Sequence, residues 1–144
     1  MLSPMIDLSR FFSLHSGLLR KAPKKHRRFL FERINWDNRL IGITGGRGTG
    51  KTTLLLQYLA KQGKTNQDYL YISADHILVE ATGLYEIATT FFQTGGKIIV
   101  VDEIHKYKNW AQEIKNLYDF FPDAQIIFSG SSTLQLQLGK TDLS

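Results

Sequence analysis

From Arg39 onward, the hydrophobic positions of the chain alternate between two spacings. Short β-branched and aromatic runs predict strands at residues 40–44, 69–73, 98–101 and 125–128. Between them, apolar residues recur at every third or fourth position, which predicts helices at residues 54–59, 84–92 and 110–121. Strands that alternate with helices in this way are typical of a parallel sheet with crossover helices. We therefore expect an α/β fold.

The first 38 residues lack this alternation, and we expect a basic helical arm and connector ahead of a core over residues 39–144. Ser3-Pro4 is a helix-start signature, and a short apolar helix is expected after it. Gly17 and Pro23 are expected to interrupt a longer helix, which makes residues 16–28 a connector. Residues 29–36 are apolar again and are expected to pack on the core.

The loop after the first predicted strand carries a phosphate-binding motif. It matches GxxxxGK[ST] with Gly45-Gly46-Arg47-Gly48-Thr49-Gly50-Lys51-Thr52. The glycines let backbone N–H groups turn toward phosphate oxygens, and the following helix adds its positive N-terminal end. Lys51 is expected to reach the β- and γ-phosphates and the Thr52 hydroxyl to coordinate Mg²⁺, with Thr53 beside them. The motif predicts a site for ATP or ADP with Mg²⁺.

The third predicted strand ends in two acids, Asp102 and Glu103. An Asp at the carboxyl end of a parallel strand faces the crevice where ligands bind in open α/β sheets, so Asp102 is expected to hold the Mg²⁺ shell. Glu103 is expected to polarise a water for attack on the γ-phosphate, which favours hydrolysis. Solvated acids at a strand end are the alternative interpretation. A position about 50 residues after a complete phosphate-binding loop favours the catalytic one.

The fourth predicted strand runs into Ser129-Gly130-Ser131-Ser132-Thr133. P-loop ATPases with an acid pair of this kind place this strand between the P-loop strand and the acid-bearing strand. Ser129 and Ser131 are therefore candidates for sensing the γ-phosphate. An ordinary Ser/Gly-rich turn is the alternative for either residue.

Two other nucleotide-dependent classes fit less well. Asp102-Glu103-Ile104-His105 spells the DExH motif of helicases, but the chain has no room for a second motor domain. His105 is thus a surface residue or a weak relay candidate. A GTPase is disfavoured because the nearest string to Asn-Lys-x-Asp, at residues 139–142, lacks the Asn and lies ten residues beyond the fourth predicted strand.

Composition and charge narrow the picture further. A chain of 144 residues with 42% hydrophobic residues suits one globular domain, and the lack of cysteine excludes disulfides and thiolate chemistry. The four histidines, His15, His26, His76 and His105, lie too far apart in sequence for a local metal pair. No apolar run approaches the ~18 residues of a membrane span, so we expect no membrane partner and a cytoplasmic location.

The net charge of +5 is concentrated in the N-terminal arm. Eight of the 18 lysines and arginines lie within residues 1–33, against only two acids. The basic residues 20–28 are a candidate contact for nucleic acid. A solvated linker is the simpler interpretation of this run.

With these residues in place, the chain resembles the bacterial AAA+ ATPases whose ATPase core precedes a C-terminal domain of unknown function, the AAA-14 / DUF4143 type. The resemblance covers residues 29–144. It rests on several strings in one order: Ile34-Asn-Trp36, Gly95-Gly96-Lys97, Asp102-Glu103-Ile104-His105-Lys106-Tyr107, Asn109-Trp110 and Asp142-Leu143-Ser144. It implies a P-loop NTPase three-layer sandwich of the AAA+/ASCE type with a mainly parallel sheet. It also implies a Mg²⁺-dependent ATP hydrolase in which Lys51, Thr52, Asp102 and Glu103 take the roles given above.

In that family, arginines suited to a finger or sensor role, a fifth strand and the C-terminal domain follow the segment that resembles residues 142–144, where this sequence ends. We therefore expect a core truncated before the fifth strand, with an edge open to self-association or to the missing C-terminal domain. Hydrolysis is expected to be weak without such arginines. The alternatives are a nucleotide-binding switch or assembly module with negligible turnover, and a DExH-type nucleic-acid motor fragment that uses the basic arm.

Overall fold

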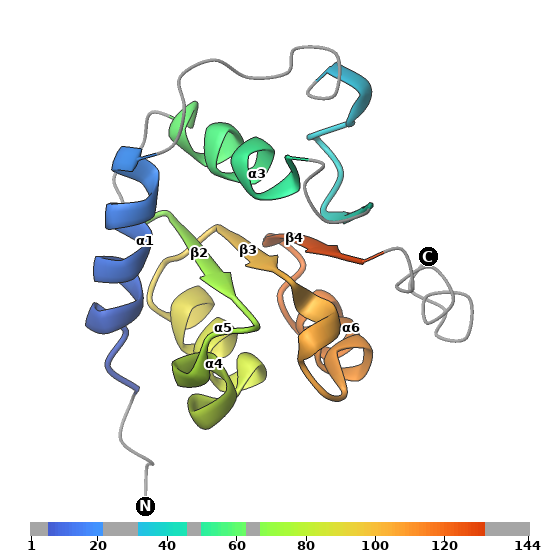
Figure 1. The fold of residues 1–144 in the computed structure, drawn as a ribbon. Helices are drawn as coiled ribbons and strands as arrows, with labels where there is room; N and C mark the ends of the chain where they lie inside the picture. The colour runs from blue at the N-terminus through green and yellow to red at the C-terminus, as the bar shows by residue number, and fades with distance from the viewer. Residues whose placement is uncertain (1–5, 22–31, 46–49, 63–66, 132–144) are drawn as a thin grey trace, which may run out of the picture.

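The computed structural model describes residues 6–21, 32–45, 50–62 and 67–131. Four strands form one all-parallel sheet in the order β1-β4-β3-β2. Figure 1 shows β4, β3 and β2 side by side in this order. They are β1 (Leu40–Thr44), β2 (Tyr69–Ser73), β3 (Ile98–Asp102) and β4 (Gln125–Gly130). All four predicted strands are therefore confirmed. The fourth strand lies between the P-loop strand and the acid-bearing strand, as predicted.

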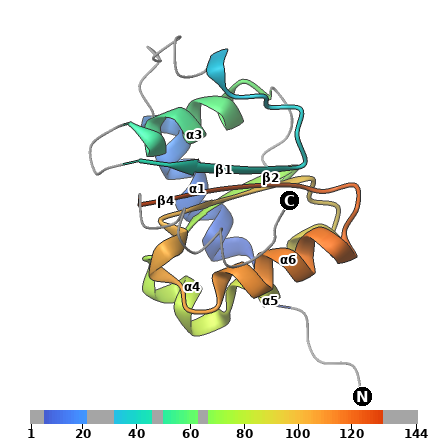
Figure 2. The ribbon, with the colours of Figure 1, turned by 90° about the vertical axis from the view of Figure 1, so that its right-hand side faces the viewer.

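Helices cover both faces of the sheet and make the expected three-layer α/β sandwich. Figure 2 shows α3 (Lys51–Ala60) on one face, with α4 (Ile77–Thr82), α5 (Leu84–Gln93) and α6 (Trp110–Phe120) on the other. Because successive strand residues point to opposite faces, each strand contributes to both cores. The core under α3 includes Leu55, Leu59, Val100 and Ile127, and the opposite core includes Phe91, Ile99, Ile114 and Ile126.

The N-terminal arm forms α1 (Ser9–Lys21), which packs along β2 at the edge of the sheet and against α3 (Figure 1). The prediction that Gly17 interrupts the helix is wrong, because α1 runs through Gly17. A glycine inside a helix costs only about 1 kcal/mol relative to alanine, and the burial of residues such as Phe11 against the core offsets that cost. The connector prediction is thus wrong for residues 16–21. Ser3-Pro4 and residues 22–28 lie outside the described residues.

The segment before β1 packs on the core, as predicted for Ile34 and Trp36. The Trp36 indole stacks on the Tyr58 ring, with centroids 4.2 Å apart and planes 10° from parallel. At the start of β1, the Arg39 guanidinium donates to the carbonyls of Tyr118, Phe121 and Ala124 near the end of α6. These contacts fix where β1 enters the sheet, and thereby where its carboxyl end delivers the phosphate-binding loop.

Two short helices were not predicted from the sequence. Helix α4 begins after His76, whose Nδ1 accepts the Leu78 N–H at 3.0 Å, and the 3-10 helix η1 (Ile104–Lys106) follows β3. The three longer predicted helices correspond to α3, α5 and α6.

Candidate functional site

The phosphate-binding motif spans the turn from β1 to α3. Gly50, just before α3, has a φ of 84°, a left-handed conformation that glycine adopts at little cost. The Gly45 N–H donates to the Gly130 carbonyl at 3.3 Å, which ties the start of the loop to the end of β4. The Lys51 ammonium donates to the Gly45 carbonyl at 2.7 Å. Residues 46–49, the middle of the motif, lie outside the described residues.

Asp102 ends β3 and lies at the centre of the site, only 2% exposed. The Thr52 hydroxyl donates to its Oδ2 at 2.5 Å, and the Tyr71 hydroxyl donates to the same oxygen at 2.6 Å. The Ser129 hydroxyl donates to Oδ1. Several donors to one carboxylate hold it in one orientation.

The strand pairing explains how these groups meet. Alternation places Tyr71 of β2, Asp102 of β3 and Ser129 of β4 on the face of the sheet that α3 covers. Thr52 lies in the first turn of α3 and completes the cluster from above that face. The structure therefore brings together Lys51, Thr52, Asp102 and Ser129 from the predicted site.

The Thr52–Asp102 pair fits Mg²⁺ in its chemistry. Mg²⁺ prefers oxygen ligands and is usually held by one or two protein oxygens together with phosphates and waters. Because the Thr52 hydroxyl gives its hydrogen to Asp102, the lone pairs of its oxygen stay available for a cation. Within the described parts of the chain, no group of three or more His, Cys, Asp and Glu residues is placed to hold a metal by itself.

Glu103 follows Asp102 in a left-handed backbone conformation, with φ of 55° and ψ of 39°. Residues other than glycine rarely adopt this conformation, and such strain is concentrated at functional sites. The Glu103 N–H points back to Oδ1 of Asp102 at 3.1 Å and to Oγ of Ser129 at 3.3 Å. Its side chain is 38% exposed, in contrast to the buried Asp102. The two adjacent acids thus have different environments, one buried and one open to water.

The end of β4 holds the two serines in different ways. Ser129 is fully buried, and its hydroxyl is engaged with Asp102. The Ser131 N–H donates to Nδ1 of His105 at 3.1 Å, and Nε2 of that ring lies 3.4 Å from Oε2 of Glu103. A role of either serine in sensing the γ-phosphate stays a prediction.

Tyr71 is the site residue that the sequence analysis missed. It is 4% exposed, and its phenol contacts the acid that the motif analysis singled out. Burial raises the pKa of Tyr71, and the neighbouring charge of Asp102 raises it further. Tyr71 therefore remains a neutral donor across the physiological pH range.

A hollow of about 390 Å³ opens beside the phosphate-binding motif. One side consists of motif residues, and the other is largely apolar. Its lining residues are Arg33, Ile34, Ile43, Thr44, Gly45, Gly50, Lys51 and Leu54. An apolar hollow that adjoins a polar, glycine-rich turn is suited to a ligand with a flat apolar part and a charged part.

Residues 37–144 match the family model of the AAA domain named AAA_14. The chain therefore belongs to this family of AAA domains, within the AAA+ P-loop ATPases, which confirms the AAA-14 part of the resemblance. Helix α1 lies outside the matched residues. A search of the curated proteins finds no match.

Several solved structures are similar in fold at low sequence identity. A DNA replication initiation factor shares 19% identity over 90% of this chain and 41% of its own, with a TM-score of 0.48. PCH-2 from C. elegans shares 16% identity over 93% of this chain and 41% of its own, with a TM-score of 0.47. AMPPCP-bound DnaA from Aquifex aeolicus shares 19% identity over 95% of this chain and 42% of its own, with a TM-score of 0.49. The chain spans about two fifths of the length of these structures.

None of the helices in the described residues has both the length and the apolar character needed to cross a bilayer.

Proposed function

We propose that this chain binds ATP together with Mg²⁺ and hydrolyses it, with residues 39–144 as the ATPase core. The observation that carries the proposal is the contact between Thr52 of the phosphate-binding motif and Asp102 of the acid pair. These residues are 50 positions apart in sequence, and folding places the Thr52 hydroxyl 2.5 Å from Oδ2 of Asp102. Lys51 is the residue before Thr52. The sequence predicts that these two motifs form one site. Membership of the AAA_14 family supports nucleotide binding at this site.

Different residues of the site would bind the phosphates and the metal ion. The positive N-terminal end of α3 would face the phosphates, and the Lys51 ammonium, which donates to the Gly45 carbonyl in this structure, would reach them. Thr52 and Asp102 would hold Mg²⁺, Thr52 through its oxygen and Asp102 as the acceptor that orients this hydroxyl. When bound, Mg²⁺ neutralises charge on the β- and γ-phosphate oxygens.

Glu103 is the proposed base. Its partly exposed carboxylate can accept a proton from a water that attacks the γ-phosphate. Asp102 is unsuited to this task because it is buried and already accepts hydrogen bonds from three hydroxyls. The strained backbone at Glu103 turns the chain between the two acids. The apolar hollow lined by Ile34, Ile43 and Leu54 is the proposed place for the adenine ring.

The test is a titration of ATP, ADP and GTP, each with Mg²⁺, into the chain and into Lys51→Ala, with phosphate release measured on the same samples. Lys115→Ala is the matched control, because Lys115 pairs with Asp119 on the exposed face of α6. We expect tight adenine-nucleotide binding and phosphate release in the chain and the control, and loss of both in Lys51→Ala. Binding without release would make the chain a nucleotide-binding switch, and equal binding by Lys51→Ala would contradict the proposal.

The proposed macromolecular partners are nucleic acid and a further protein unit, either a second copy of the chain or a C-terminal domain. Binding of DNA or RNA through residues 20–28 predicts salt-dependent affinity that disappears when Lys24, Lys25, Arg27 and Arg28 are neutralised together. Self-association, or pairing with a C-terminal domain, would use the edge of the sheet at β1, which pairs with β4 alone in the described residues. Sedimentation of the chain at several concentrations tests self-association.

A further inference from the structure

Tyr71 lies on β2, the edge strand next to β3, and no sequence motif marks it. Its phenol donates to Oδ2 of Asp102 at 2.6 Å, and its backbone N–H donates to Nδ1 of His15 on α1 at 2.9 Å. We propose that Tyr71 is a positioning residue that fixes Asp102 for Mg²⁺ binding, and that helix α1 holds Tyr71 in place through His15. This inference rests on the proposed function. It goes beyond that function by giving the N-terminal helix, which lies outside the family match, a part in the metal site.

The Asp102 carboxylate is held by hydroxyl donors from both neighbouring strands. Strand β3 lies between β4 and β2, and each neighbour supplies one hydroxyl donor to Asp102, Ser129 from one side and Tyr71 from the other. The two donors bind different oxygens, Oδ1 and Oδ2, so together they fix the plane of the carboxylate. With that plane fixed, Oδ2 also receives the Thr52 hydroxyl at 2.5 Å. The orientation of the Thr52 oxygen toward a cation thus depends on Tyr71.

Asp102 and Tyr71 are both buried. Asp102 is 2% exposed and Tyr71 is 4% exposed, so solvent does not readily replace the phenol when it is removed. A buried carboxylate that loses a donor keeps the cost of its desolvation. Without the phenol, Oδ2 keeps only the Thr52 hydroxyl among its hydroxyl donors, so the plane of the carboxylate and the Oδ2 position that serves Thr52 are less firmly fixed.

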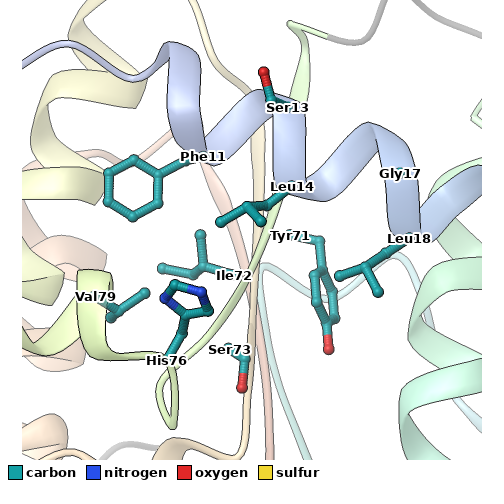
Figure 3. A pocket seen from close by; sticks show the side chains of 10 residues that line it. All are labelled: Phe11, Ser13, Leu14, Gly17, Leu18, Tyr71, Ile72, Ser73, His76 and Val79. Carbon is teal, nitrogen blue, oxygen red and sulfur yellow. The ribbon is translucent and has the colours of Figure 1, made fainter.

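Helix α1 holds the backbone of Tyr71 through His15. Tyr71 lies on an edge strand, and its N–H donates to Nδ1 of His15 on α1. His15 is fully buried between α1 and β2. Figure 3 shows Gly17 and Leu18 of α1 above Tyr71, with the hydroxyl of Tyr71 pointing away from the helix. The residue is therefore held at two ends, by α1 through its backbone and by Asp102 through its phenol.

A cavity of about 400 Å³ adjoins this arrangement between α1, β2 and α4 (Figure 3). Tyr71 lines it together with Leu14 and Leu18 of α1 and Val79 of α4. Packing in the core under α3 and hydrogen bonds to His15 and Asp102 together set the position of Tyr71.

The experiment measures the Mg²⁺ concentration at half-maximal ADP binding in the chain and in Tyr71→Phe. ADP affinity in EDTA is measured alongside. We expect the Mg²⁺ midpoint to rise about three- to tenfold in Tyr71→Phe, with the affinity in EDTA unchanged. The matched control is Tyr69→Phe, because Tyr69 lies on the same face of the same strand, is buried to a similar degree, and pairs with Ile98, four residues before Asp102. The substitution keeps the ring that lies against His15. Its midpoint should not move.

A second pair of variants tests the role of α1 and covers the case in which Tyr71→Phe does not fold. His15→Asn keeps an acceptor near the Nδ1 position, whereas His15→Leu removes it. We expect the Mg²⁺ midpoint to rise in His15→Leu and to return toward that of the unmodified chain in His15→Asn. An unchanged or lower midpoint in folded Tyr71→Phe, or in His15→Leu if the former does not fold, overturns the inference. If the unmodified chain shows no Lys51-dependent ADP binding, the proposed function fails and this inference fails with it.

Discussion

Nε2 of His105 lies 3.4 Å from Oε2 of Glu103, while Nδ1 of the same ring accepts the Ser131 N–H. Because Nδ1 is an acceptor, a neutral His105 carries its hydrogen on Nε2, the nitrogen that faces Glu103. The His105 imidazole thus connects the backbone of Ser131, just after β4, to the carboxylate of Glu103, the proposed base. The sequence is compatible with His105 as a surface residue or a weak relay candidate, and the geometry favours the relay.

We expect His105→Leu to lower the rate of phosphate release about three- to tenfold, because Glu103 loses the group that orients it. Nucleotide affinity should not change, since His105 contacts Glu103 and Ser131 rather than the phosphate-binding motif. His105→Gln offers one acceptor and one donor on a single side chain, and it should restore most of the rate. Single-turnover phosphate release and equilibrium ADP binding check these outcomes. Equal rates for the Leu and Gln variants would contradict the relay.

Replacing Glu103 tests the division of roles between the two acids. We expect Glu103→Gln to lower phosphate release at least about 100-fold, the size of effect that general-base catalysis gives. ATP affinity should stay within about threefold, because the side chain is partly exposed and Asp102 keeps its own donors. Glu113→Gln on α6 is a control away from the site. A release rate unaffected by Glu103→Gln would assign the chain to the nucleotide-binding modules.

His15 predicts a specific dependence of stability on pH. Burial lowers the pKa of His15 from 6.5 to about 4, and Nε2 is buried without a hydrogen-bond partner in the described structure. Between pH 6.5 and pH 4 the unfolded chain takes up a proton that the folded chain refuses. The free energy of unfolding should therefore fall as the pH falls through this window, by at most about 3 kcal/mol from this residue. About one unit above pH 6.5, where the unfolded histidine is also neutral, His15 should contribute no slope.

Urea unfolding between pH 4.5 and pH 7.5 measures this slope, and the comparison is with His15→Asn, which does not titrate there. The variant should show a shallower loss of stability toward acid. His76→Asn is the control, because His76 is exposed and an asparagine keeps an N-cap acceptor for α4. If His15→Asn and the unmodified chain lose stability in parallel, His15 is not the titrating group.

Arg39 joins the start of β1 to the end of α6. Its guanidinium donates to three carbonyls and lies 4.1 Å from the centre of the Tyr118 ring. Carbonyls at a helix end lack partners within the helix and carry partial negative charge, which a cation stabilises. We expect Arg39→Met to lower the free energy of unfolding by about 2 kcal/mol, as for the loss of hydrogen bonds from a charged donor.

The measurement is urea unfolding, with the exposed Arg10→Met on α1 as the control. Arg39→Lys should recover only part of the loss, because one ammonium cannot reach three carbonyls in the planar geometry of a guanidinium. A variant Arg39→Met as stable as the control would show that the helix end does not need this residue.

Much of the fold followed from local patterns. The β-branched run at residues 98–101 and the apolar stripe at residues 84–92 correspond to elements that are buried as predicted. The phosphate-binding motif and the acid pair were recognisable because the chemistry restricts both residue type and spacing. Helix α1 was cut short in the prediction because a local breaker, Gly17, was weighed without the packing that overrides it.

The position of Tyr71 could not be read from the sequence for a different reason. Its contact with Asp102 depends on the register of β2 and β3, in which Ser73 aligns with Asp102. Tyr71 lies two residues before Ser73 and therefore on the same face of the sheet. Nothing local to residues 69–73 marks that register. Likewise, the tautomer of His105 follows from a backbone N–H at residue 131, which only the tertiary structure brings near.

The insertion of β4 between β1 and β3 has a consequence for the order in which the molecule is assembled. In the described chain, β1 pairs with β4 alone, so the strand that delivers the phosphate-binding loop has no place in the sheet until residues 125–130 exist. A chain emerging from the ribosome can form its β2–β3 pair early, but this closure is non-local and comes late. We therefore expect affinity for nucleotide to appear abruptly once residues 125–130 have been synthesised, when β4 joins the two halves of the site.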